Sequence, residues 1–157
     1  MKFSSNEDIE APIDAAFRIY TDFDHFERIA LRRGADVVRT DDLRTPGVGM
    51  AWKATFKFRG RVRVVVGEIV EYSTPDDFAI DVESPNLRGA FAVEMVPLSK
   101  NRTRVSIALE IKPKSLTGRL MVQSLKLAKS RLNRRFKARA GEFAKTMEQR
   151  FKSGELA

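Results

Sequence analysis

The sequence contains no cysteine, and this absence excludes several kinds of site. Without cysteine there can be no disulfide, no thiolate metal ligand and no cysteine nucleophile, and such a composition suits a reducing cytosol. The single histidine, His25, lies beside Asp22 and Asp24 in the segment TDFDH. Adjacent residues in a helix-capping turn rarely converge on a metal ion, so we assign no residue to a metal, a cofactor or a catalytic role.

Long apolar runs are also missing. No stretch approaches the roughly 20 apolar residues of a membrane-spanning helix, and the initial segment MKFSSNEDIEAP lacks the apolar core of a signal peptide. A phosphate-binding glycine loop, a nucleophile elbow and the zinc-protease pattern are absent as well. We therefore expect a soluble, cytoplasmic protein that folds as a single domain over residues 1–157.

Positive charge is concentrated near the C-terminus. The chain has 29 Lys and Arg against 21 Asp and Glu, a net charge of +8. Residues 114–152 contain twelve Lys and Arg and two Glu, a net charge of +10, so the other residues sum to −2. The same segment carries an apolar stripe at helical spacing, which consists of Met121, Leu125, Ala128, Leu132, Phe136, Phe143 and Met147. We predict one long, uninterrupted basic helix that lies on a large apolar surface.

The preceding residues predict that surface. Residues 2–9 read as a strand, and residues 13–20 and 23–33 read as two short helices that Pro12 and Asp22 begin. From residue 51 onward, apolar and polar residues alternate in segments separated by short turns, as in a half-buried antiparallel sheet. The predicted fold class is α+β, with two short N-terminal helices, a curved antiparallel sheet of about six or seven strands, and the long C-terminal helix.

This order of elements resembles the START-like helix-grip superfamily, the group of polyketide cyclases/dehydrases and lipid transport proteins. The segments that carry the resemblance are IEAPIDAAFRIYTDFDHF, GVGMAW, GEIVEYSTPDDF and TRVSIALEIKPKSLTGRL, and it extends over essentially the whole chain. The resemblance implies a curved sheet wrapped around the C-terminal helix, with a cavity between them for an apolar molecule. One departure is the segment FERIALRRG, because many relatives carry a tryptophan where this second short helix ends.

The apolar residues that face such a cavity are the candidate site. The alternating pattern fits two interpretations, a filled core or an adaptable pocket. Under the second we assign ligand contact to Trp52, Phe56, Phe58, Val64, Phe78, Ile80, Phe91, Val93 and Met95 in the sheet, and to Met121, Leu125 and Leu132 in the helix. Arg139 falls within the helical stripe, and it would hold a ligand carboxylate, pair with Glu94 or Glu68, or extend past the sheet edge.

Three functions remain open at this point. The first is binding of a hydrophobic or amphipathic small molecule, such as a lipid, polyketide, quinone or sterol-like compound. The second, implied by the resemblance, is a cyclase- or dehydrase-like enzyme that uses the same cavity. The third is docking of the basic helix on anionic lipid or RNA, although a solvated surface explains the same charges. Nucleic acid is the weaker partner, because the helix offers no base-reading motif and no exposed aromatic residue.

A second apolar strip lies on the opposite side of the predicted helix. It consists of Leu116, Leu120 and Leu127. Leucines in this position would be exposed unless something covers them, and the candidates are a homodimer partner, a membrane surface or the loops of a cavity entrance. The sequence leaves a monomer and a homodimer equally open.

Overall fold

The computed structural model describes residues 1–154, which form a seven-stranded sheet and four helices. In chain order the elements are β1 (Lys2–Ile9), α1 (Ile13–Tyr20), α2 (Phe23–Arg32), β2 (Asp36–Arg39), β3 (Ala51–Phe58), β4 (Arg61–Ser73), β5 (Asp77–Glu83), β6 (Leu87–Ser99), β7 (Arg102–Pro113), α3 (Leu116–Leu127) and α4 (Lys129–Ser153). The predicted α+β class and the helix-grip arrangement are confirmed.

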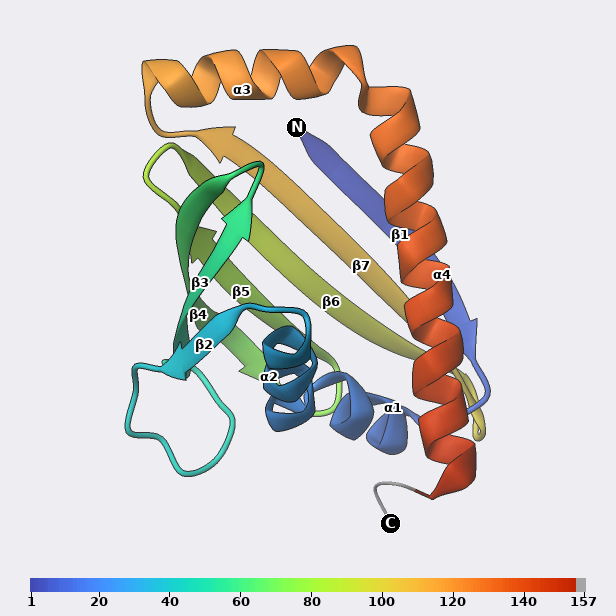
Figure 1. Cartoon of the computed structure of the whole chain (residues 1–157). Helices are drawn as coiled ribbons and strands as arrows, with labels where there is room; N and C mark the ends of the chain where they lie inside the picture. Colours follow the sequence, from blue (N-terminus) through green and yellow to red (C-terminus); the bar gives the residue numbers. More distant parts are fainter. Residues whose placement is uncertain (155–157) are drawn as a thin grey trace.

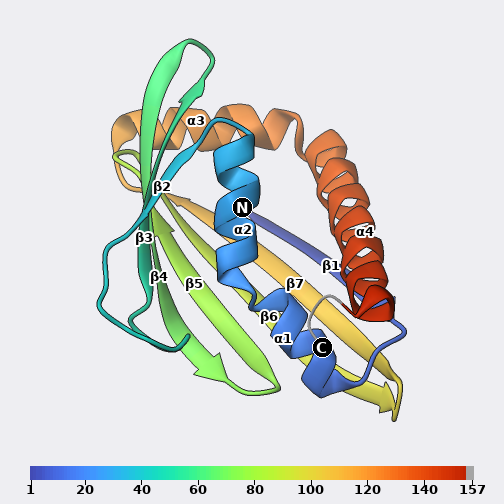
Figure 2. The same ribbon diagram turned by 60° about the horizontal axis from the view of Figure 1, so that its bottom comes forward.

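The sheet is antiparallel throughout, in the order β1-β7-β6-β5-β4-β3-β2. Strands that follow one another in the chain are neighbours from β2 to β7, whereas β1 closes the far edge by pairing with β7. The pairing of β4 with β5 shifts register between Ile69 and Glu71, which is an irregularity that bends a strand. The sheet curves, and α1, α2 and α4 lie on the same side of it (Figures 1 and 2).

Many buried core residues lie where α1 and the end of α4 meet the sheet. Phe17 of α1 is buried, and its ring centre lies 5.4 Å from that of Tyr72 and 6.1 Å from that of Phe78. Met147 of α4 is buried in the same cluster. The buried Thr103 hydroxyl donates a 2.8 Å hydrogen bond to the carbonyl of Ala11 and so joins β7 to the segment before α1. This packing fixes the helices at one end of the sheet.

The basic C-terminal segment, predicted as one helix, is two helices. α3 ends at Leu127, Ala128 leaves helical geometry with φ −105° and ψ 17°, and α4 begins at Lys129. α3 runs across the top of the view in Figure 1, whereas α4 runs down its right side. The prediction of an uninterrupted helix is therefore wrong, and α4 alone is the long helix of the fold.

The turn between β5 and β6 fixes the direction of α3. Ser115 caps α3 by accepting a hydrogen bond from the Gly118 amide (3.0 Å), and its hydroxyl donates to Oδ1 of Asn86 (2.8 Å). The Lys114 amide donates to the Asn86 carbonyl (2.8 Å). A Cβ at position 118 would overlap that same carbonyl oxygen, so only glycine lets the helix pass this close. α3 thus starts against the sheet edge.

The residues of β4 that face the helices are not the ones predicted. Arg59 and Gly60 make a two-residue turn with φ values of 53° and 74°, so that Phe58 pairs with Arg61. In this register Val64 pairs with Thr55, and paired residues share a face. The expected inward orientation of Val64 is therefore wrong, because Thr55 points to the face opposite Trp52. The residues of β4 that share the face of Trp52 include Val65, Gly67 and Ile69.

Candidate functional site

A cavity of about 520 Å³ lies between the concave face of the sheet and the helices α2 and α4. Its volume falls within the range of roughly 300–1,000 Å³ that is usual for small-molecule sites. Seven lining residues come from the sheet, four from each of the two helices and one from α1: Val37, Trp52, Phe78, Ile80, Phe91, Val93 and Ile107; Phe23, Phe26, Glu27 and Ala30; Phe136, Arg139, Ala140 and Phe143; Tyr20.

Only some of the residues predicted to contact a ligand line the cavity. Residues of that set that line the cavity are Trp52, Phe78, Ile80, Phe91, Val93 and Arg139. Phe56 and Phe58 share the face of Trp52 but lie further along β3, toward its turn, and Phe58 is exposed. Met95 is buried in the core beyond the lining residues. Val64 lies on the other face of the sheet.

The three predicted helical contacts lie outside the cavity lining. Met121 and Leu125 belong to α3, and Leu132 lies one turn into α4; all three are half-buried. Their predicted contact with a ligand depends on a single straight helix along the cavity. Because the chain turns at Ala128, only the part of α4 from Phe136 onward reaches the lining.

The sequence-based site contains no residue of the α2 wall. Phe23, Phe26 and Ala30 follow one another at helical spacing, and all three line the cavity. Ring centres show how this wall is held: Phe23 lies 5.2 Å from Trp52, and Phe26 lies 5.5 Å from Phe143. These aromatic contacts connect α2 to both the sheet and α4, so they hold the cavity walls against one another.

In the described part of the chain, two of the lining residues carry a charge, Glu27 and Arg139. Glu27 is hydrogen-bonded within the protein. The Trp52 indole donates a hydrogen bond from Nε1 to Oε1 of Glu27 and so links β3 to α2. The guanidinium carbon of Arg39 lies 5.8 Å from the centre of the same indole ring. Hydrogen bonds from Arg39 hold the pKa of Asp41 well below its usual range, helped by the Ala51 amide. This chain of contacts fixes the rim beside Trp52.

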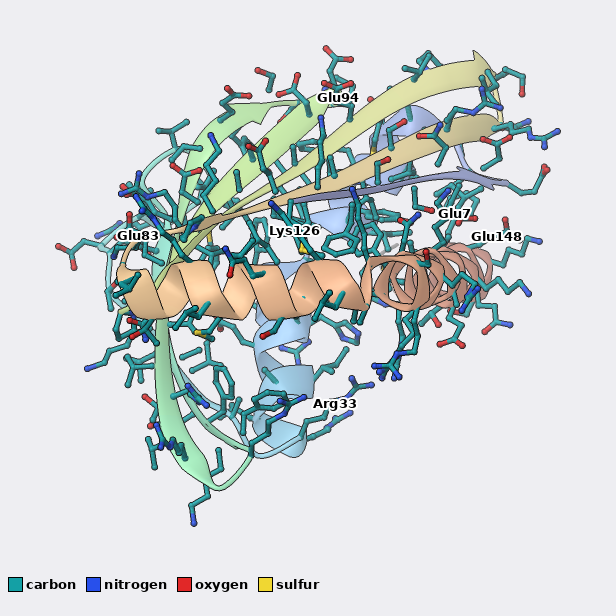
Figure 3. All side chains as sticks on the ribbon, turned by 90° about the horizontal axis from the view of Figure 1, so that it is seen from above. Glu7, Arg33, Glu83, Glu94, Lys126 and Glu148 are labelled. Atoms are coloured by element: carbon teal, nitrogen blue, oxygen red, sulfur yellow. The ribbon has the colours of Figure 1, made fainter. Side chains whose placement is uncertain are left out.

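Arg139 is the other charged residue of the lining. Within residues 1–154, no hydrogen bond or ion pair holds its exposed guanidinium. The predicted pairing with Glu94 or Glu68 is wrong, because both carboxylates are exposed on the opposite face of the sheet. Figure 3 shows Glu94 projecting from the side of the sheet away from α3 and α4. Arg139 therefore presents a cation at the edge of an apolar cavity.

The acidic turn around His25 stabilises the packing of α2 against α4. The Asp22 carboxylate accepts a hydrogen bond from the His25 amide (3.4 Å) at the start of α2, and it forms an ion pair with Arg150 of α4 (2.7 Å). Among the described residues, no group of three or more His, Asp or Glu side chains is placed to hold a metal ion. Tyr20 contributes its ring to the lining, and burial, with a smaller effect of Glu7, raises the pKa of its hydroxyl far above neutral pH.

Comparison with known proteins adds a family to this geometry. A family model described as polyketide cyclase / dehydrase and lipid transport matches residues 1–148. The chain belongs to this family. The suspected START-like relationship is thereby confirmed. A search of curated proteins gives no match.

Solved structures with the same fold are distant in sequence. A protein from Thermus thermophilus has a TM-score of 0.67 at 14% identity, with 98% of each chain covered. The Zhui aromatase/cyclase from Streptomyces sp. R1128 has a TM-score of 0.65 at 9% identity, with 96% of this chain and 95% of that chain covered. Norcoclaurine synthase from Thalictrum flavum, in complex with dopamine and hydroxybenzaldehyde, has a TM-score of 0.68 at 12% identity, with coverage of 98% and 87%. At such identities the similarity establishes the fold alone.

Proposed function

We propose that this family member binds a hydrophobic or amphipathic small molecule, of the lipid, polyketide, quinone or sterol-like kind, between the sheet and helices α2 and α4. The observation that carries the proposal is the cavity of about 520 Å³ with its almost entirely apolar lining. Burying about 200 Å² of apolar ligand surface there would contribute about 5 kcal/mol before the entropic costs of binding. The family description, which includes lipid transport, supports the same class of ligand.

Filling the cavity tests this proposal. Ala30 lines the cavity from α2, so Ala30→Trp places an indole in the space a ligand would occupy. We expect the variant to lose enhancement of fluorescence by the neutral apolar dye N-phenyl-1-naphthylamine, with affinity at least about tenfold lower. Ala138→Trp adds the same side chain at an exposed position of α4 and is the matched control. Equal dye binding by both variants would contradict the proposal.

Arg139 defines the polar end of the proposed ligand. An unpaired guanidinium beside an apolar wall favours a molecule whose apolar body ends in a carboxylate or a similar acid. We expect Arg139→Met to weaken binding of a long-chain fatty acid about tenfold, since a hydrogen bond to a charged group contributes about 1.5–3 kcal/mol. Binding of the corresponding fatty alcohol should change little. Lys137→Met removes a neighbouring exposed cation as a control, and the acid preference should survive it.

Turnover of a ligand is the alternative to binding alone. A cyclase- or dehydrase-like reaction in this cavity would depend on the few polar groups of its lining. Glu27 already accepts a hydrogen bond from Trp52, which positions α2 over the sheet. The Arg139 guanidinium is suited to hold an anion, because an arginine side chain donates hydrogen bonds and accepts none. Binding is therefore the function that the lining supports better.

A further inference from the structure

The outer face of α3 is apolar although nothing in the described chain covers it. Leu116, Leu120 and Leu127 are 74%, 60% and 93% exposed. At helical spacing the three leucines fall within a narrow stripe, on the side opposite the buried Gly118 and Val122. We call these three residues the leucine ridge. An exposed ridge of this kind marks an interaction surface, because leucine in water carries an unfavourable hydration free energy.

The surroundings of the leucine ridge are strongly basic. Residues 111–141 contain ten Lys and Arg and no Asp or Glu. Arg119 and Lys126 lie beside the ridge on α3 itself, and both are exposed. Figure 3 looks onto this end of the molecule, with α3 in front, Lys126 labelled on it and Glu83 near its start. Glu83 is neutralised by ion pairs with Lys114 (3.3 Å) and Arg88 (3.1 Å).

A second element with the same chemistry reaches the same end of the molecule. The hairpin between β3 and β4 extends toward the end where α3 lies, as both Figure 1 and Figure 2 show. Its tip exposes Phe58 and Val62 beside the cations Lys57, Arg59 and Arg61. Two separate parts of the chain therefore present large apolar side chains flanked by cations.

We propose that the leucine ridge of α3, with the tip of the β3–β4 hairpin, docks the protein on a bilayer that contains anionic phospholipid. Leucine and phenylalanine side chains enter the boundary between headgroups and acyl chains, while the flanking Lys and Arg side chains contact lipid phosphates. A second copy of the chain fits this surface poorly, because its own cations would face those of the first. RNA supplies phosphates but no apolar partner for leucine.

The attachment is peripheral. Of the helices in residues 1–154, none is long and apolar enough to cross a membrane. An amphipathic helix at the surface needs only its apolar ridge and its basic flanks, and α3 has both. The docking surface is separate from the cavity lining, so the proposal stands or falls independently of the small-molecule ligand.

Vesicle flotation with leucine variants tests the apolar half of the proposal. The native chain should float with vesicles of phosphatidylcholine and phosphatidylglycerol but not with phosphatidylcholine alone. Leu120→Asp and Leu127→Asp together should lower the partition coefficient at least about tenfold, while circular dichroism remains native because both residues are exposed. Leu98→Asp, also exposed and located near the end of β6, is the matched control and should bind as the native chain does.

Charge reversal tests the electrostatic half. Arg119→Glu with Lys126→Glu should lower the partition coefficient at least about tenfold, because each cation near the surface contributes about fivefold. Lys100→Glu, at the β6–β7 turn, should leave binding unchanged. Three results would overturn the proposal: vesicle binding that ignores the leucine substitutions, RNA binding through the same residues without vesicle binding, or a dimer in light scattering that Leu120→Asp dissociates.

Discussion

Replacing Asp22 with alanine should lower the free energy of unfolding by about 3 kcal/mol. Its carboxylate pairs with the Arg150 guanidinium at 2.7 Å, and the Arg150 side chain is only 8% exposed. Removing Asp22 takes this carboxylate away from a buried cation and also removes the cap of α2. Since α2 forms one wall of the cavity and Arg150 belongs to α4, the loss should loosen the site as well. Urea denaturation followed by circular dichroism measures the effect.

Two further variants separate the ion pair from a general effect of losing charge. Asp24→Ala removes an exposed carboxylate from the first turn of α2 and should cost less than about 0.5 kcal/mol. Combining Asp22→Ala with Arg150→Met should restore part of the loss, because neither half of the buried pair then remains. If Asp22→Ala and Asp24→Ala unfold at the same urea concentration, the pair does not hold the helices together.

Gly118→Ala should destabilise the protein by about 1–3 kcal/mol, although alanine favours a helix more than glycine does. A Cβ at this position overlaps the Asn86 carbonyl oxygen, which is backbone and cannot rotate away. α3 would have to leave the β5–β6 turn, and its cap at Ser115 would lose the Asn86 contact. Faster hydrogen exchange at the amides of α3, together with a lower unfolding midpoint, is the expected signature.

Gly141 in α4 is the natural control for this substitution. A Cβ there would lie 3.5 Å from Oε1 of Glu7, an ordinary contact with a side chain that can move. Gly141→Ala should therefore stabilise the protein by about 1 kcal/mol through helix propensity alone. If both glycine substitutions stabilise the protein, the close approach of α3 to Asn86 does not contribute to the free energy of unfolding.

The predicted sheet and helices depended on patterns that each segment carries by itself. The strands alternate, Pro12 and Asp22 precede the two short helices, and α4 keeps its stripe from Phe136 to Met147. The break at Ala128 has no such local cause, since neither glycine nor proline stands there. It follows from the anchoring of α3 by Ser115 and Gly118 to a turn 29 residues before Ser115, which a local pattern does not contain.

The cavity was harder to predict than the fold, for the same reason. Alternation identifies the residues of one face, as it did for Trp52, Phe78 and Phe91, but it does not show which face becomes concave. On β4 both faces carry valine, so only the register set by the Arg59–Gly60 turn distinguishes Val64 from Val65. The predictions for Met121, Leu125 and Leu132 are wrong for a single reason, because all three require an unbroken helix.

The placement of β1 has a consequence for how the chain folds during synthesis. Phe3 pairs with Leu109 and Ile9 with Thr103, so β1 cannot pair until β7 has been synthesised. α4, which covers β1, is made later still. Contacts this distant in the chain slow folding. Until β7 is synthesised, the apolar residues of β1 stay exposed to water. We expect this domain to assemble only after β7 and α4 have been synthesised, since both contact β1.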